Sequence, residues 1–431
     1  MFEIKPREKM VERALLVGVC VKPEDPQDAD ELLDELSELS RTLGIPVVTR
    51  KVVVIREPQA RFLIGSGKAE EICRLVQEHH CDVIIFDNPL TPAQQRNWEA
   101  LAKVTVIDRQ EIILDIFAQR AQTKEARIQV DLARMAYSLP RLTRAWSHLG
   151  KQGGGIGSRG EGESQLEQDR RKIRGQMDRL RRDLEQVRRA RATQRKDRKT
   201  TPVPNAAIVG YTNAGKSSLL RLLTNADVLV EDQLFATLDT TTRRVDLPNK
   251  QALLLTDTVG FVRRLPHELV EAFKATLEEA VQADFLIHLL DASHPKVFDF
   301  FDTTQNVLDE LGATDKPTLI VFNKIDKISD SATRVLLRHR FPTAIFISVQ
   351  TGEGIKLLLT KISEFVTKDS RKLIFRLPHE RGDLLAMLHR EGEIHDTRYT
   401  EKNIEVIATL SGKILDFEDQ FSSLWNGNDT E

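Results

Sequence analysis

The segment AAIVGYTNAGKSSLLRLL, residues 206–223, restricts the possible folds of this chain more than any other feature. An apolar run leads into a G-x-x-x-x-G-K-S sequence, and leucines at helical spacing follow it. A strand, a glycine-rich turn and a helix in this order form a P-loop, whose backbone N–H groups surround a phosphate. The segment therefore predicts a nucleotide-binding α/β domain, with contacts from Gly210, Tyr211, Thr212, Asn213, Ala214, Gly215, Lys216 and Ser217.

A second motif, Asp257-Thr258-Val259-Gly260, supplies groups that respond to the terminal phosphate. Asp257 follows a predicted strand and suits an indirect contact to Mg²⁺, which the Ser217 hydroxyl ligates. The Gly260 N–H is expected to bond the γ-phosphate and to lose that bond on hydrolysis. Lys216 and Gly260 are therefore the predicted transition-state contacts.

The sequence Asn323-Lys324-Ile325-Asp326 predicts that the base is guanine. The Asp326 carboxylate can accept from both N1–H and N2–H₂ of guanine, whereas adenine presents an acceptor at N1 and leaves the carboxylate unpaired. We expect Asn323 to bond the guanine edge and brace the P-loop, and the Lys324 stem to cover the base. A backbone N–H for guanine O6 is expected from Ser348, Val349 and Gln350.

A threonine-rich stretch after the P-loop is where a nucleotide-dependent switch segment is expected. Its predicted GTP contacts are Phe235, Ala236, Thr237, Leu238 and Asp239. We predict that the Thr237 hydroxyl is the second protein ligand of Mg²⁺. Thr240, Thr241 and Thr242 are the alternatives, and a polar loop or edge strand is the alternative structure.

Phe261 occupies the position at which many GTPases carry a glutamine that orients the attacking water. A phenyl ring has no hydrogen-bonding group, so we expect slow intrinsic hydrolysis that a partner or a bound ion must assist. The catalytic residue itself stays unknown. Asn213 leaves two interpretations open. GTPases that resemble this chain at that position can use K⁺ as a charge-compensating ion, and an asparagine in a glycine-rich loop can also simply cap a turn.

With 431 residues, the chain has room for two to four domains. Its net charge of −2 gives no general sign of nucleic-acid binding, and its three cysteines form no metal-binding pattern and indicate reduced thiols. The apolar run 14–21 is too short to cross a membrane. We predict an N-terminal α/β domain (1–110), a helical hairpin with a basic glycine-rich tip (111–200), a P-loop GTPase domain (201–367) and a small C-terminal α/β domain (370–431).

The N-terminal region alternates predicted strands and helices, and it contains a second glycine-rich sequence, Gly65-Ser66-Gly67-Lys68. The strands are expected at 15–21, 47–55, 83–86 and 104–107, and the helices at 28–42 and 68–79. A helix-entry turn is the favoured interpretation, since Phe62 replaces the first P-loop glycine and Ala69 replaces the Mg²⁺-binding hydroxyl. A second nucleotide site, for ATP, is the alternative.

Residues 111–200 show helical periodicity on either side of a glycine-rich, basic stretch. The apolar stripes are Ile128, Leu132, Met135 and Leu139, and then Ile173, Met177, Leu180, Leu184 and Val187. Two antiparallel helices would place the intervening residues at the tip of a hairpin. Cations there suit RNA phosphates, so the candidate RNA contacts are Arg141, Arg144, Lys151 and Arg159, with a plain flexible loop as the alternative.

These residues resemble the HflX family of ribosome-associated GTPases over nearly the whole chain. The segments that carry the resemblance are LIGSGKAEEI, IIFDNPLTPAQQRN, GGGIGSRGEGESQLEQDRR, GYTNAGKS, FATLD, DTVGF and NKID. The resemblance implies Mg²⁺ at Ser217 and Thr237. It also implies GTP-driven action on the large (50S) ribosomal subunit and its rRNA, including the splitting of stalled or idle ribosomes. We expect a cytoplasmic monomer, in part peripheral to the membrane and without an integral membrane segment.

Three positions depart from the family pattern: Glu161 and Thr240 stand where proline is common, and Val349 where alanine is common. The first weakens what the resemblance implies for the tip, and the second loosens the switch segment. An RNA-maturation or RNA-remodelling GTPase, with the ATP site in its N-terminal domain, is the alternative function.

Overall fold

The computed structural model describes residues 12–144, 159–199, 203–224, 234, 235, 238, 240–249, 251–264, 279–328, 330–367, 371–391, 393–400 and 403–410. The chain divides into two compact units. The first contains Met1–Val187, Asp232–Ala236 and Arg264–Phe273; the second contains Arg188–Glu231, Thr237–Arg263 and Lys274–Glu431.

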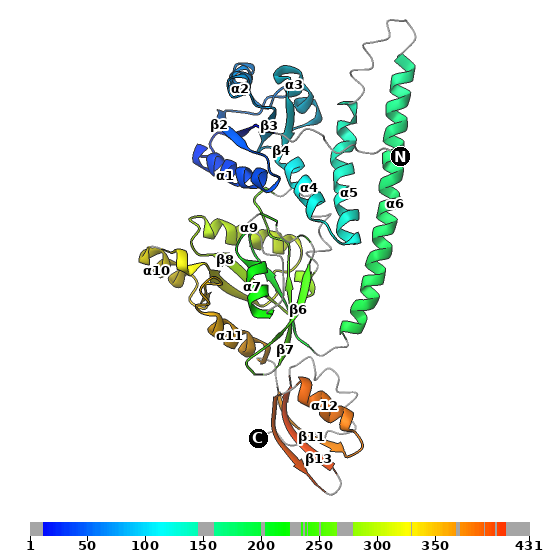
Figure 1. Ribbon diagram of the computed structural model, residues 1–431, viewed down its shortest axis with the longest axis vertical. Helices are drawn as coiled ribbons and strands as arrows, with labels where there is room; N and C mark the ends of the chain where they lie inside the picture. Colours follow the sequence, from blue (N-terminus) through cyan, green and yellow to red (C-terminus); the bar gives the residue numbers. More distant parts are fainter. Residues whose placement is uncertain are drawn as a thin grey trace. The chain divides into compact units, whose positions relative to one another are not determined.

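The first unit begins with a four-stranded parallel sheet in the order β2-β1-β3-β4 (Figure 1). The strands are β1 (Ala14–Val21), β2 (Val47–Ile55), β3 (Val83–Phe86) and β4 (Thr105–Asp108), and the helices between them are α1 (Pro26–Thr42), α2 (Ser66–Glu78) and α3 (Pro92–Ala102). Strands β1 and β3 are continuous apolar runs, as expected for strands covered on both faces. The predicted strands and helices agree with the observed ones within two residues.

Local chemistry sets where the helices start, and an aromatic group fills the core between them. The Asp25 side chain accepts from Gln27 N–H at the start of α1, and Thr91 and Gln94 form a capping box at the start of α3. On α3, Trp98 is fully buried, donates through Nε1 to the Phe62 carbonyl at 2.9 Å and packs on the Phe62 ring.

Four helical segments follow this sheet: α4 (Arg109–Arg120), α5 (Lys124–Ser138), the 3₁₀ turn η1 (Leu139–Arg144) and the 41-residue α6 (Arg159–Lys199). On α6 the predicted stripe is the shielded face, with Met177 and Leu184 buried and Ile173, Leu180 and Val187 partly buried. One expectation is corrected, because α6 already begins at Arg159. Arg159 therefore belongs to a helix and not to a tip loop.

A buried ionic cluster lies at the carboxyl edge of the first sheet. Asp87 and Asp108 follow β3 and end β4, and both are 1–2% exposed. Arg109 donates to Asp87 at 2.8 Å and also contacts Glu35. Arg264, which belongs to the same unit, donates to the second Asp87 oxygen at 2.7 Å. Two guanidinium groups thus neutralise the buried Asp87 carboxylate.

The second unit contains a six-stranded sheet in the order β10-β9-β8-β5-β7-β6 (Figure 1). Its strands are β5 (Asn205–Val209), β6 (Thr241–Asp246), β7 (Ala252–Asp257), β8 (Phe285–Asp291), β9 (Thr318–Asn323) and β10 (Ile345–Phe346). Its helices are α7 (Lys216–Thr224), α9 (Val297–Glu310), η2 (Ile325–Lys327), α10 (Ser331–Arg340) and α11 (Ile355–Thr367). All neighbouring strands are parallel except β6, which pairs antiparallel with β7.

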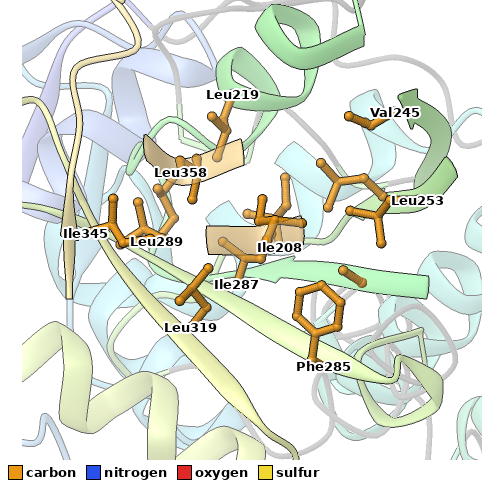
Figure 2. Close-up of a cluster of buried hydrophobic side chains, with 14 of the residues drawn as sticks. Ile208, Leu219, Val245, Leu253, Phe285, Ile287, Leu289, Leu319, Ile345 and Leu358 are labelled. Atoms are coloured by element: carbon orange, nitrogen blue, oxygen red, sulfur yellow. The ribbon is translucent and has the colours of Figure 1, made fainter. Parts of the chain in front are cut away.

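Alternate residues of the central strands supply two separate cores. Ile208, Ile287 and Leu289 pack with Leu219 of α7 and Leu358 of α11 (Figure 2). On the other face, Leu290 and Phe322 pack with residues of α9 and α10. His288 also points to that face, where its ring stacks on Phe301 at 5.1 Å.

The C-terminal part of the second unit is a three-stranded antiparallel sheet in the order β11-β13-β12 with one helix. The elements are β11 (Arg371–Pro378), α12 (Gly382–Glu391), β12 (Glu393–Tyr399) and β13 (Asn403–Leu410). Phe375, Leu384 and Val406 are among the residues of its small core. The α/β fold class with these parts in this order is confirmed, whereas the exact domain boundaries stay a prediction.

Two findings apply to the described residues. They contain no helix long and apolar enough to span a membrane, and no cluster of three or more histidine, cysteine or acidic side chains arranged to hold a metal. Cys20, Cys73 and Cys81 form no disulfide with one another.

The buried ionic cluster yields a stability prediction. Asp87→Asn removes one charge and leaves two arginines near a neutral side chain, so we expect a loss of about 3 kcal/mol in the free energy of unfolding. Denaturant unfolding followed by tryptophan fluorescence, which includes the buried Trp98, measures it. The control is Asp34→Asn, because Asp34 forms an ion pair with Arg50 on the exposed surface and should cost less than about 1 kcal/mol. Equal losses in the two variants would contradict the prediction.

A pH prediction follows from His288, which is fully buried. Burial, assisted by the charge of Lys216, lowers the pKa of His288 to about 3. Between that value and the unfolded pKa of about 6.5, the unfolded state binds the extra proton, so stability falls as the pH falls through this window. We expect thermal unfolding of His288→Phe, which keeps a flat ring, to lose less stability between pH 7 and pH 5 than the parent. The same loss in both proteins would refute this assignment.

Candidate functional site

The predicted P-loop connects β5 to α7, and its two glycines are required by close contacts. Gly210 has a φ of +147°, and a Cβ there would lie 2.2 Å from the Leu289 carbonyl oxygen. Gly215 has a φ of +98°, and its Cβ would lie 2.4 Å from Nδ2 of Asn323. Only glycine fits both conformations. The loop therefore packs directly on β8 and on the end of β9.

Lys216 lies inside the loop with 6% of its surface exposed. Its Nζ donates to the carbonyl oxygens of Gly210 at 3.1 Å and Tyr211 at 2.8 Å. Burial lowers the pKa of Lys216 to about 8, and the negative charge of Asp257 opposes this shift. The loop thus holds a cation at the centre of its own backbone, where phosphate oxygens can replace the carbonyl groups as acceptors.

Ser217 and Asp257 meet at the carboxyl end of β7. The Ser217 hydroxyl donates to Oδ2 of Asp257 at 2.7 Å, and the Asp257 side chain is fully buried. Oxygen ligands of this kind are the ones that Mg²⁺ prefers. The pair therefore fits a magnesium site, in which Ser217 would ligate the ion and Asp257 would hold it in place.

The Asp257-Thr258-Val259-Gly260 motif lies against the P-loop, as predicted. The Thr258 hydroxyl donates to the Ile208 carbonyl at 2.7 Å. Two backbone hydrogen bonds follow: Thr212 N–H donates to the Phe261 carbonyl at 2.8 Å, and Phe261 N–H donates to the Gly210 carbonyl at 3.2 Å. Phe261 is 2% exposed, so its ring packs inside the domain.

Asn323 connects the base-recognition motif to two other segments. Its Nδ2 donates to the Ala214 carbonyl at 2.8 Å, and its Oδ1 accepts from Val349 N–H at 3.1 Å. The predicted brace of the P-loop is therefore present. The Val349 N–H, which we considered for guanine O6, is engaged with Asn323 in this structure.

The sequence did not reveal the partner of Lys324. Lys324 has a φ of +62°, and its Nζ pairs with Asp291 at 2.8 Å. Asp291 ends β8 and β8 is next to β9, so the neighbouring carboxyl ends of parallel strands bring the two together. The sequence feature that could have indicated this pair is Asp291, the polar residue at the end of a mostly apolar strand. Asp326 lies in η2 beside this pair.

Ser348 and Gln350 lie in the loop after β10, where the Ser348 hydroxyl accepts from Thr351 N–H at 3.1 Å. This loop is drawn to the site because Val349 contacts Asn323. The predicted segment 348–350 of the nucleotide site is therefore connected to the P-loop through the carboxamide of Asn323.

The structure settles part of the predicted switch segment. Ala236, Thr237 and Asp239 lie outside the described residues. Leu238 is buried in the second unit, and Phe235 belongs to the first unit, where its ring meets Phe117 edge to face at 4.7 Å. Thr241 and Thr242 lie in the edge strand β6, where the Thr242 and Thr256 hydroxyls are 2.9 Å apart.

The RNA candidates receive different placements. Arg141 is drawn inward: it donates to the Leu90 carbonyl at 2.7 Å and to Gln95 at 3.0 Å, and it stacks on Tyr137. Its guanidinium group is thus used within the first unit. Arg144 ends η1, Arg159 begins α6, and Lys151 lies outside the described residues.

Two remaining alternatives are narrowed. Asn213 has a left-handed φ of +59°, which asparagine tolerates, so the turn alone accounts for this residue type and K⁺ stays a proposal. In the first unit, Gly65 caps α2 with a φ of −66°, and Lys68 pairs with Glu71 on the same helix at 3.3 Å. This geometry favours a helix-entry turn over an ATP site.

Comparison with known proteins agrees with this geometry. Residues 30–118, 120–198 and 205–324 match family models described as GTP-binding GTPase N-terminal, GTP-binding GTPase middle region and 50S ribosome-binding GTPase. The GTPase HflX of Akkermansia muciniphila is 49% identical over 95% of this chain and 97% of its own length. The GTPase HflX of Escherichia coli K12 is 42% identical over 88% of each.

Among solved structures, the SsGBP complex with GDP aligns with 83% of this chain and 99% of its own, with a TM-score of 0.47 and 25% identity. A P-loop with its serine beside a buried aspartate, a brace from Asn323 and relatives that match nearly end to end lead to one conclusion. The chain is a GTP-hydrolysing enzyme that belongs to the HflX family of GTPases.

Proposed function

We propose that this GTPase binds the large ribosomal subunit in its GTP form, separates stalled or idle ribosomes and hydrolyses GTP when the ribosome stimulates it. The observation that carries the proposal is the buried, apolar Phe261 directly after Gly260. Because the Phe261 ring cannot orient the attacking water, other groups must do so for GTP to be hydrolysed. The family model described as a 50S ribosome-binding GTPase supports the ribosome as their source.

The nucleotide contacts that we propose come from five segments. The P-loop residues 210–217 surround the phosphates, and residues 257–260 follow the γ-phosphate. Residues 323–326, together with 348–350, read the guanine. The switch residues 237–239 close the site, with Thr237 joining Ser217 as a Mg²⁺ ligand. When bound, Mg²⁺ supplies charge neutralisation for the phosphates.

For RNA we propose Arg144, Lys151 and Arg159, and we leave out Arg141 because its guanidinium group is bound within the first unit. Exposed arginines on α6 add to the basic surface, among them Arg171, Arg174, Arg179 and Arg182. Cations of this density bind a phosphate backbone without reading sequence. We further propose that the protein acts as a monomer in the cytoplasm.

Guanine selectivity is tested at Asp326. Asp326→Asn replaces an acceptor with a donor and should weaken GTP and GDP binding by about 100-fold, the loss of two hydrogen bonds to a charged group. Xanthine carries a carbonyl group where guanine carries N2–H₂, so xanthosine diphosphate should bind the variant better than the parent. Equilibrium binding of both nucleotides measures this. Asp315→Asn, an exposed position in the same domain, is the control. Unchanged GDP affinity in Asp326→Asn would remove Asp326 from the site.

The ribosome proposal is tested by GTP turnover with and without purified large ribosomal subunits. We expect stimulation of about 10-fold or more, because outside groups commonly complete such sites. A complex with a non-hydrolysable GTP analogue should co-sediment with the subunit. Absence of both effects would reject the proposal.

The basic residues are tested in the same assay. Replacing Arg144, Lys151 and Arg159 by alanine should weaken subunit binding and its salt dependence, while GTP affinity stays unchanged. The control replaces three exposed cations of the first unit, Arg41, Arg74 and Lys103. An equal effect of both triple variants would show that general charge, and not these positions, determines binding.

A further inference from the structure

The segment after Asp257 closes on the P-loop through its backbone. Residues Tyr211 and Phe261 form an isolated parallel bridge, built on the hydrogen bonds from Thr212 N–H to Phe261 and from Phe261 N–H to Gly210. Both bonds are made by the first residues of the P-loop, Gly210 and Thr212, which come before the N–H groups at the start of α7. The bridge therefore leaves the N–H groups at the helix end of the loop untouched.

This bridge holds Gly260 close to the P-loop. A Cβ on Gly260 would lie 2.8 Å from Thr212 Cα and 2.9 Å from Nζ of Lys216. A methyl group on Gly260 thus cannot fit against the Thr212 backbone. A γ-phosphate bound by both the Gly260 N–H and Lys216 needs room that this arrangement does not leave. Gly260 provides it by moving away from Thr212, and Lys216 provides it by releasing the P-loop carbonyls.

One P-loop side chain anchors the closed arrangement. The Tyr211 hydroxyl accepts from Arg263 N–H at 2.7 Å, two residues beyond Phe261. The Tyr211 ring stacks on Phe300 of α9, with centroids 3.8 Å apart and planes 4° from parallel. Tyr211 is 5% exposed. Its ring is fixed by α9, and its hydroxyl fixes the chain that carries Gly260.

We propose that Tyr211 is a positioning residue of the GTPase reaction. Tyr211 holds Gly260 in the place that the γ-phosphate must enter. GDP binds without opening this closure, whereas GTP must first separate Phe261 from Gly210 and Thr212. Tyr211 thereby sets the ratio of GTP to GDP affinity and the rate at which GTP enters. This inference goes beyond the ribosome proposal and does not depend on it.

The test is Tyr211→Phe, which keeps the stacked ring and removes the acceptor for Arg263. Losing one hydrogen bond from the closed form should raise the affinity for a non-hydrolysable GTP analogue about 3-fold relative to GDP. The association rate of the analogue should rise by a similar factor, while that of GDP stays constant. Stopped-flow measurements with fluorescent analogues of both nucleotides, without ribosomes, give all four values.

A second variant loosens the anchor differently. Phe300→Leu removes the flat ring on which Tyr211 stacks and should shift the affinity ratio in the same direction. Phe298→Leu is the matched control, because Phe298 lies on the same helix but packs on Phe341, the residue that follows α10. It should leave the ratio unchanged.

Two results would overturn the proposal. If Tyr211→Phe weakens GDP and the GTP analogue equally, Tyr211 only supports the fold of the P-loop. If neither affinity nor either association rate changes, its bond to Arg263 N–H has no role in nucleotide entry. Thermal unfolding of each variant with and without GDP shows that the domain is folded in every comparison.

Discussion

The nucleotide-binding edge of this protein depends on a single buried carboxamide. Asn323 donates to the P-loop at Ala214 and accepts from the loop after β10 at Val349, so one side chain sets the distance between three segments. It can do so only because Gly215 has no Cβ, since a methyl group there would lie 2.4 Å from Nδ2. A buried carboxamide needs hydrogen-bond partners for both its NH₂ group and its oxygen. This requirement specifies one arrangement of the three segments.

Around this brace, the domain places charged groups where water is excluded. Lys216 and Asp257 are both buried within the P-loop region, and His288 is neutral on the neighbouring strand. Charges are costly in such a place, and phosphates with a metal ion would satisfy the lysine and the aspartate together. The site is therefore shaped for a ligand that carries several negative charges and a cation.

The parallel sheet of the first unit gathers a different set of charges at its carboxyl edge. Asp87 binds Arg109 and Arg264 there, and Asp108 accepts from the N–H groups of Leu90 and Glu111. This edge is the usual ligand position of an open α/β sheet, and here the side chains of the chain itself fill it. The cluster thus serves packing, in contrast to the phosphate-shaped charges of the P-loop.

Local patterns were sufficient for much of this protein. The P-loop, the guanine motif and the α6 stripe depend on residues that are close in the sequence, because helix and strand periodicity and glycine turns are local properties. The sequence by itself therefore determined the fold class and the GTPase class, and it named the residues that we propose for the nucleotide. Only the tertiary structure decided that Arg141 turns inward, that Lys324 pairs with Asp291 and that Phe261 bridges to Tyr211. Those partners lie up to 51 residues apart in the sequence. Contacts across such separations form only where the sheet places the ends of different strands at the same edge.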